Sequence, residues 1–140
     1  MEAIIGSEFP KKVIPLIDSA KQSIKIVVFD WRWYPNDPGN PVQLFNQALV
    51  RAVRRGVDVL AISNVADIVG ILKNVGIKAK HIFTKNIIHA KMMIIDDETI
   101  IIGSHNYTQS AFTMNQEISV IIKGQEDISR FVNFFTNLYG

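Results

Sequence analysis

The residues with the clearest chemical potential lie between His89 and Asn106. His89 and Lys91 are two positions apart, as are Ser104 and Asn106, so each pair shares one face of an extended strand. The residues between the pairs read as a strand, a polar turn that begins at Asp96, and a returning strand. Such a hairpin would bring an imidazole, an ammonium, a hydroxyl and a carboxamide together at one end of a sheet. This set of groups can hold and attack an anionic oxygen centre such as a phosphodiester.

This stretch resembles the HKD motif of the phospholipase D superfamily, which reads His-x-Lys-x4-Asp-x6-Gly-Ser-x-Asn. Every specified position of that pattern is filled without a gap, by His89, Lys91, Asp96, Gly103, Ser104 and Asn106. The short chain with a single motif is similar to the small Nuc-type endonucleases of the superfamily. The resemblance extends to the segments 17–21 and 55–59, and the aromatic loop 31–41 departs from it.

The resemblance implies a role for each motif residue. His89 would be the nucleophile, Lys91 and Asn106 would hold the phosphate, and Ser104 would be an additional donor. An imidazole that attacks phosphorus gives a phosphohistidine, which splits one difficult hydrolysis into two steps. The ammonium and the neutral donors would stabilise the charge on the phosphoryl oxygens in the transition state.

Glu117 is a further candidate because it opens an apolar strand, where an unpaired carboxylate is costly. Related enzymes have a glutamate about this far beyond the motif that accepts a hydrogen bond from the second nitrogen of the histidine. We expect Glu117 to fix the tautomer of His89 in this way. The alternative is a glutamate at a strand edge, in water.

Asp96 belongs to the motif but is expected to secure the hairpin or to pair with a neighbouring base. The acidic residues 96–98 favour a solvated turn over a metal site, and the resembled family needs no metal, so neither a metal nor another cofactor is expected. Gly103 is expected to be structural. His105 occupies the free position of the motif and could approach the substrate.

The loop 31–41 is rich in proline and aromatic residues. Trp31, Trp33 and Tyr34 could stack on unpaired bases, which is worth about 1–3 kcal/mol per base. They could equally pack at a subunit interface or cover the core. Trp31 and Trp33 are therefore possible substrate-binding residues.

The chain carries one copy of the motif, whereas larger relatives carry two. The chemistry needs a nucleophile and an acid that protonates the leaving oxygen, and acid–base assistance is worth about 10²–10⁴ in rate. A homodimer with its active site at the two-fold interface would supply both groups, because the same patch from each subunit meets across the axis.

The length of 140 residues fits one domain, residues 1–140. No apolar run reaches the roughly 20 residues of a membrane span. The N-terminal residues lack the pattern of a signal peptide, which favours a cytoplasmic protein, although a mature secreted chain or an excised domain would look the same.

The absence of cysteine excludes disulfides and a thiolate nucleophile. Lys and Arg outnumber Asp and Glu across 31–95, which indicates either a polyanion partner or scattered surface lysines.

Apolar spacing predicts alternating strands and helices, with the motif hairpin and a closing helix from Ile128 at the end. A helix beginning close to Pro15 is expected, because an interior proline removes a hydrogen bond. Gly56 is placed to end the second helix as a left-handed cap. This order of elements predicts an α/β fold, a phospholipase D-like α/β/α sandwich with a mixed sheet flanked by helices.

These observations together indicate a metal-independent phosphodiesterase, a nuclease acting on DNA or RNA, in a homodimer. Three alternatives remain open. A phospholipase D-type lipid phosphodiesterase would need an apolar rim, which the aromatic loop could supply. A non-cleaving nucleic-acid-binding module would not need to keep all of His89, Lys91, Asn106 and Glu117. The chain could also be the nuclease domain of a larger helicase or restriction protein.

Overall fold

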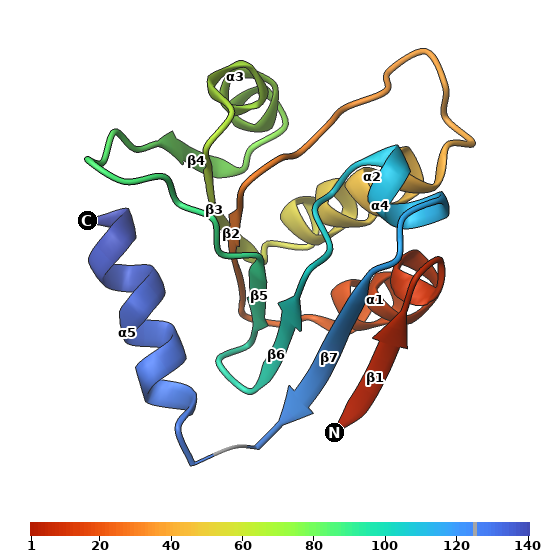
Figure 1. Cartoon of the computed structure of the whole chain (residues 1–140). Helices are drawn as coiled ribbons and strands as arrows, with labels where there is room; N and C mark the ends of the chain where they lie inside the picture. The colour runs from red at the N-terminus through yellow and green to blue at the C-terminus, as the bar shows by residue number, and fades with distance from the viewer. Residues whose placement is uncertain (125) are drawn as a thin grey trace.

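A computed structural model describes residues 1–124 and 126–140, and within them seven strands form one mixed sheet. The strand order across the sheet is β1-β7-β6-β5-β2-β3-β4 (Figure 1). The strands are β1 (Glu2–Ile5), β2 (Ser23–Val28), β3 (Asp58–Ser63), β4 (Lys78–His81), β5 (Met92–Ile95), β6 (Thr99–Gly103) and β7 (Ile118–Lys123). The predicted α/β sandwich with a mixed sheet is confirmed.

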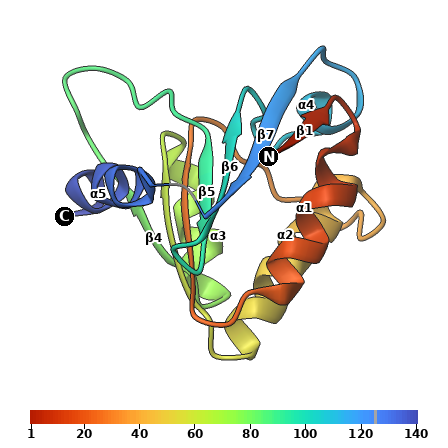
Figure 2. The ribbon, with the colours of Figure 1, turned by 90° about the horizontal axis from the view of Figure 1, so that it is seen from below.

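Helices cover the two faces of this sheet unequally. One face carries four of the helices, α1 (Glu8–Ser19), α2 (Pro41–Arg54), α3 (Ala66–Asn74) and α4 (Gln109–Thr113), whose apolar side chains share one core with the strands. The other face carries α5 (Ile128–Tyr139), which packs over a smaller apolar cluster. Figure 2 shows the sheet from its end, with α5 on one side and α1 and α2 on the opposite side.

The register of the sheet brings the ends of four strands together. Val27 near the end of β2 lies opposite Met92 at the start of β5. Met92 in turn lies opposite Ile102 near the end of β6. Gly103 at the end of β6 lies opposite Ser119 near the start of β7. The residues just beyond these strand ends, which include the motif residues, therefore meet at one edge of the sheet.

The motif hairpin has the predicted boundaries, and Asp96 secures it. Asp96 and Asp97 both have positive φ angles, 54° and 51°, as the two central residues of a type I′ turn require. The Asp96 carboxylate accepts hydrogen bonds from the backbone N–H groups of Lys21, Gln22 and Ser23, at 2.7 to 3.1 Å. Partial burial acts to raise the pKa of Asp96, but these backbone donors stabilise the carboxylate and lower the pKa below its usual value. The carboxylate thus ties the hairpin to the start of β2.

The first helix corrects the expectation that it begins close to Pro15. α1 begins at Glu8, and Pro15 lies inside it. Pro15 is exposed, whereas Phe9, Val13 and Ile17 form the buried stripe of the helix. The hydrogen bond that the proline removes is therefore lost on the solvent side, where water can solvate the freed carbonyl, and the apolar stripe carries the helix past the proline.

The second helix has the caps that its sequence indicates. The Asn40 side chain accepts a hydrogen bond from the backbone N–H of Val42, and Pro41 occupies the first turn. Gly56 follows the helix with φ 91°, which confirms the predicted left-handed cap. These caps fix α2, and with it the end of the loop 29–40, which passes the edge of the sheet where the motif residues lie.

Candidate active site

Four strand ends supply the candidate residues. His89 and Lys91 precede β5, Ser104 and Asn106 follow β6, and Glu117 precedes β7. Phe29 and Asp30, which the sequence did not single out, follow β2 at the same edge. The structure thus brings both ends of the motif hairpin to one place, as its spacing predicted.

His89 and Lys91 are in direct contact. The Lys91 Nζ atom lies 3.2 Å from Nδ1 of His89 and donates to the His89 backbone carbonyl at 2.9 Å. The Phe29 ring supports this pair, with its centroid 5.1 Å from the imidazole centroid and 5.9 Å from Lys91 Nζ. Burial lowers the pKa of Lys91, and the charge of Glu117 opposes that shift.

The contact with Lys91 decides the tautomer of His89. An ammonium group only donates, so Nδ1 of His89 accepts in this arrangement and a neutral ring carries its proton on Nε2. The exposed imidazole is thus held at one nitrogen by the lysine. A phosphate group that drew Lys91 Nζ away would release the Nδ1 lone pair.

Glu117 lies at the site but contacts other partners than we expected. Its Oε1 accepts a hydrogen bond from Ser104 Oγ at 2.5 Å, and its Oε2 accepts one from Asn115 Nδ2 at 3.0 Å. The expected hydrogen bond with His89 is not formed among these described residues, and the contact to Nδ1 of His89 comes from Lys91 instead. Ser104 Oγ in turn accepts from the backbone N–H of Ile118 at 3.0 Å, so the hydroxyl links the motif loop to β7.

Asn106 is fixed by the end of β2. Its Oδ1 accepts a hydrogen bond from the backbone N–H of Asp30 at 3.0 Å. This bond engages the amide oxygen, so the amide nitrogen is the group that can donate to a phosphate. The Asp30 carboxylate forms a bidentate pair with Arg32, at 2.9 and 3.1 Å. The position of Asp30 two residues beyond the buried strand β2 is the signal that could have identified it.

Gly103 is required by the close approach of β6 and β7. A Cβ atom at this position would overlap the side chain and the Cα atom of Ser119 and the carbonyl oxygen of Ile118. The motif glycine therefore lets the strands come near enough for Ser104 to reach Glu117.

His105 does not approach the substrate, which corrects the expectation from the sequence. Its side chain is only 2% exposed and stacks on Phe9, with ring centroids 4.5 Å apart. Its Nδ1 lies 2.7 Å from Ser119 Oγ, and its Nε2 lies 2.8 Å from the carbonyl oxygen of Gly6. Burial lowers the pKa of His105, although the Gly6 carbonyl and the Glu117 charge oppose the shift.

Trp31 is also excluded from base stacking. Its indole is buried, packs against Tyr107, and donates to Asn46 Oδ1 at 2.8 Å. The apolar ring fills the core beside α2, and the indole N–H has a hydrogen-bond partner there. Burial of Trp31 therefore leaves no polar group of the side chain unsatisfied. Trp33 is partly exposed and lines a shallow hollow of about 390 Å³ with Asp30, Arg32 and Gln109. Its contact with substrate stays a prediction.

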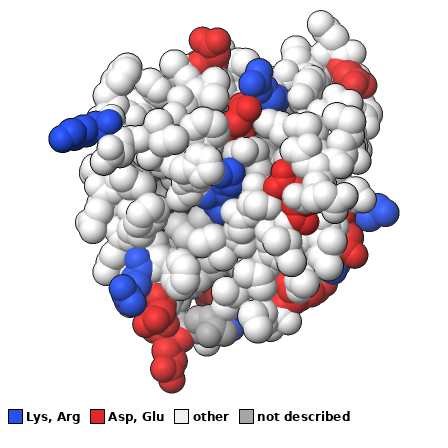
Figure 3. Space-filling model, in the orientation of Figure 1, with Lys and Arg blue, Asp and Glu red and all other residues white. Residues whose placement is uncertain are grey.

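The charges do not form a basic strip on the face shown in Figure 3. There the Lys and Arg side chains stand apart from one another among uncharged atoms and acidic side chains. On this face the scattered-lysine interpretation is the better one.

The described residues contain no group of three or more His, Asp or Glu that could hold a metal ion. Nor does any helix within 1–124 or 126–140 have the length and apolar character that a membrane span needs.

Comparisons with known proteins agree with this geometry. The family model described as "Cardiolipin synthase, PLD-like domain" matches residues 13–139. A relative named mitochondrial cardiolipin hydrolase, from Canis lupus familiaris, is 26% identical over 137 residues, which is 96% of this chain and 52% of that protein. The chain thus spans about half the length of such curated relatives.

Two solved structures share the fold over nearly their whole length. Nuc from Salmonella typhimurium, described as a phospholipase D family member, has a TM-score of 0.80 and 27% identity, covering 99% of this chain and 93% of that one. NucT from Helicobacter pylori has a TM-score of 0.78 and 20% identity, covering 98% and 93%. Since the family model covers nearly the whole sequence and the motif residues meet at one edge of a matching sheet, this chain belongs to the PLD-like domain family of the phospholipase D superfamily.

Proposed function

We propose that this protein is a metal-independent phosphodiesterase that hydrolyses DNA or RNA through a covalent phosphohistidine, in a homodimeric active site. The observation that carries the proposal is the contact between His89 and Lys91, at the sheet edge that also holds Asn106 and the Ser104–Glu117 pair. A nucleophile lies beside a cation and neutral donors, which is the arrangement that phosphoryl transfer needs.

In the first step, a ring nitrogen of His89 with a free lone pair attacks phosphorus while the bond from phosphorus to the leaving oxygen breaks. The substrate phosphate competes for Lys91 Nζ and so removes the donor that now lies on Nδ1 of His89. Lys91 then neutralises the non-bridging oxygens, and the amide nitrogen of Asn106 adds a neutral donor. Ser104 would add a second donor once its hydroxyl proton turned from Glu117 to the phosphate. The other nitrogen of His89 keeps its proton during the attack.

The leaving oxygen needs a proton, and the attacking imidazole cannot supply it from the opposite side of phosphorus. His89 of a second subunit would donate that proton. It would then take a proton from water as the water attacks the phosphohistidine and the bond from phosphorus to nitrogen breaks. The reaction thus returns both imidazoles to their first state, and each subunit contributes one histidine.

The similarity to Nuc over nearly the whole of both chains supports a nucleic-acid substrate. The presence of His89, Lys91, Asn106 and Glu117 together favours catalysis over a non-cleaving binding module. A role as the nuclease domain of a larger protein remains compatible with the proposal, since the chain spans about half of its curated relatives.

A lipid phosphodiester is the second candidate substrate. Two observations favour it: the curated relatives are named cardiolipin hydrolases, and exposed apolar side chains lie close to His89 in the sequence, at Phe83 and Ile87. An apolar rim of this kind is what acyl chains would need beside the phosphate pocket.

The test is cleavage of labelled single- and double-stranded DNA and RNA, and of cardiolipin and phosphatidylcholine vesicles, in excess EDTA. We expect nucleic-acid cleavage that survives chelation, falls by a factor of about 10³ or more in His89→Ala, and persists in His81→Ala. His81 is the matched control because it lies on β4, apart from the motif strands. Release of lipid products alone would favour the second candidate, and cleavage that EDTA abolishes would contradict the mechanism.

A further inference from the structure

The hollow of about 390 Å³ that Trp33 lines lies between the loop after β2 and the start of α4. The segment 30–34 and the segment 108–110 contribute its lining. Both segments are joined to the candidate active site, because Asp30 donates its backbone N–H to Asn106 and the segment 108–110 begins two positions after Asn106. The hollow therefore lies next to the amide that is proposed to hold the phosphate.

Trp33 offers a flat aromatic surface on a stretch of chain that is already fixed. The residue before it, Arg32, donates its backbone N–H to the carbonyl oxygen of Tyr107 at 3.0 Å. The residue after it, Tyr34, donates its backbone N–H to Gln43 Oε1 at 2.8 Å. The Trp33 ring packs in part against the core and stays partly exposed. A ring that is held in place before binding loses little conformational freedom when a ligand stacks on it.

Polar groups beside this ring can bond the edge of a flat ligand. Gln109 Oε1 accepts a hydrogen bond from Asn40 Nδ2 at 3.1 Å, so the amide nitrogen of Gln109 is the group that can donate to a ligand. Ser110 adds a hydroxyl to the lining. The Arg32 side chain is 58% exposed even though it forms a bidentate pair with Asp30. Hydrogen-bonding groups around an aromatic surface are what proteins use to bind unpaired bases.

The charges in the hollow fit a base better than a lipid headgroup. Aromatic rings bind a quaternary ammonium such as choline through its positive charge. Here the Asp30 carboxylate is already paired with Arg32, so a cationic ligand would meet the guanidinium without a free carboxylate to balance it. A glycerol headgroup has no flat face that could lie on Trp33. A nucleobase is neutral and planar, and its edge carries both donors and acceptors.

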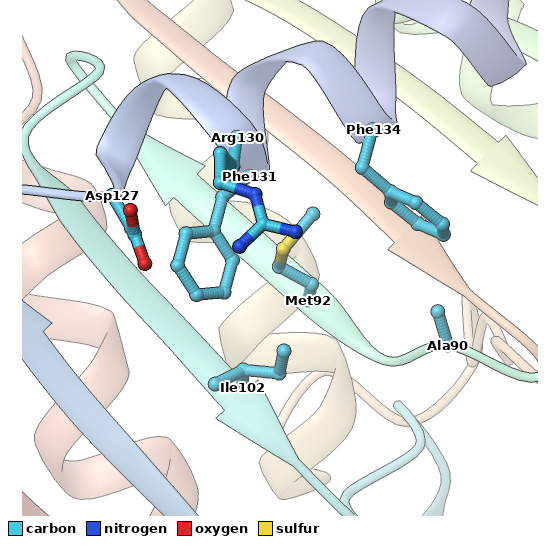
Figure 4. A pocket seen from close by; sticks show the side chains of 7 residues that line it. All are labelled: Ala90, Met92, Ile102, Asp127, Arg130, Phe131 and Phe134. Atoms are coloured by element: carbon cyan, nitrogen blue, oxygen red, sulfur yellow. The ribbon is translucent and has the colours of Figure 1, made fainter.

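The groove under α5 has a different character. It has a volume of about 430 Å³, and Figure 4 shows Phe131 and Phe134 pointing from α5 toward the strands that carry Met92 and Ile102. Its walls are therefore mainly apolar. A base placed there would lose the hydrogen bonds that its edge makes with water and would find few replacements, which is costly. The hollow beside Asn106 supplies such replacements.

We infer that this hollow is a nucleobase subsite, defined by Asp30, Arg32, Trp33 and Gln109, in which Trp33 stacks on an unpaired base next to the scissile phosphate. This inference rests on the proposed function and names the feature of the substrate that the site recognises. One sugar separates a base from its phosphate, so a phosphate held at Asn106 would bring a neighbouring base to the hollow. A base inside a duplex is stacked on both faces and cannot lie on the indole. The protein therefore prefers single strands or unpaired ends.

The test measures the binding of a labelled DNA oligonucleotide, single-stranded or in a duplex, by fluorescence anisotropy. All proteins carry His89→Ala, which keeps the oligonucleotide intact. We expect Trp33→Ala to weaken single-strand binding by at least about fivefold, the lower end of what stacking of one base contributes, and to leave duplex binding unchanged. Trp33→Phe keeps an aromatic face and should lose less. Leu44→Ala is the matched control, because Leu44 is exposed but lines a separate hollow beside α1.

The fluorescence of the protein gives a second measurement. Trp31 and Trp33 are the two tryptophans of the chain, and Trp31 is buried. A base that stacks on Trp33 should quench its emission, whereas an oligonucleotide of the same length without bases should not. Thermal unfolding checks that each variant is folded.

The outcomes separate the nucleobase subsite from the proposed activity. Quenching of Trp33 in a wild-type protein that cleaves no phosphodiester would support the subsite and reject the function. Equal kcat/KM of the wild type and Trp33→Ala on single strands would, in a protein that cleaves them, support the function and overturn the subsite. Equal losses of single-strand and duplex binding in Trp33→Ala would also overturn it, since the ring would then contact the backbone. Quenching by glycerophosphocholine alone would overturn it in favour of a lipid headgroup.

Discussion

His105 ties the motif turn 103–106 to the end of the N-terminal strand β1, because its Nε2 atom donates to the carbonyl oxygen of Gly6 at 2.8 Å. A carbonyl only accepts, so Nε2 carries the ring proton and Nδ1 accepts from the Ser119 hydroxyl. His105 lies between Ser104 and Asn106 in the sequence, and both of those side chains are held at the site. The residue at the unspecified position of the motif is therefore held in place by hydrogen bonds in this protein.

We predict that His105→Ala destabilises the fold by on the order of 2–3 kcal/mol, because it removes one buried and one partly buried hydrogen bond and the stacking on Phe9. Urea unfolding at neutral pH measures this loss. His105→Gln, which can keep one of the two hydrogen bonds, should lose less. Equal stability of the wild type and His105→Ala would contradict the role assigned to the ring.

The same ring should make stability depend on pH. The pKa of His105 is lowered in the folded protein, so below pH 6.5 the unfolded chain binds a proton that the folded chain does not. Stability should therefore fall as the pH drops from 6.5 toward the folded pKa, and then level off with respect to this group. His105→Gln should show a smaller change across this window in urea titrations, and a parallel change in both proteins would assign the effect to other groups.

Asp96 offers a test of the hairpin that does not touch the reaction. Asp96→Ala should destabilise the protein by about 1–3 kcal/mol, since it removes an ionised acceptor of three backbone N–H groups and places alanine at a positive φ angle. Asp96→Asn tolerates that φ angle and isolates the effect of the charge. Because the folded pKa of Asp96 is lowered, its contribution is present above pH 3.8 and is lost as the pH falls through the folded value. Stability curves of the wild type and Asp96→Asn should therefore converge in strong acid.

Much of this site could be predicted from the sequence because its residues lie at fixed spacing on one hairpin. The alternation of side chains places His89 with Lys91, and the turn brings back Ser104 and Asn106. The partners of those residues could not be predicted in the same way. Glu117 binds Ser104 because of the register between β6 and β7, and sequence spacing does not fix that register.

Burial was the other property that the sequence did not determine. Trp31 and His105 have polar nitrogen atoms that favour exposure, yet both are buried because partners from distant segments satisfy those atoms. The predicted start of α1 was wrong for a related reason. Local rules place Pro15 near a helix start, whereas the buried stripe of Phe9, Val13 and Ile17 continues through it.

Gly103 should tolerate no side chain. We predict that Gly103→Ala destabilises the protein by on the order of 3 kcal/mol, because the added Cβ would overlap Ser119 and the Ile118 carbonyl and push β6 away from β7. Gly70→Ala is the control, since a Cβ at Gly70 meets nothing within 4 Å and lies on the exposed side of α3. It should be neutral or stabilise the helix by up to about 1 kcal/mol. Thermal unfolding of both variants decides whether the close approach of the strands is obligatory.

Lys91 and Glu117 should together set the alkaline limit of the proposed activity. The ammonium form of Lys91 would bind the phosphate, and burial lowers the pKa of Lys91, so cleavage should decline with rising pH below the usual lysine value of 10.5. The carboxylate of Glu117 opposes that shift, so Glu117→Gln should move the decline to still lower pH. Lys91→Arg, whose guanidinium stays charged, should remove the decline even if its rate is lower. Profiles of kcat/KM against pH for the three proteins measure this effect, and an alkaline limb that is identical in all of them would show that Lys91 does not bind the reacting phosphate as a cation.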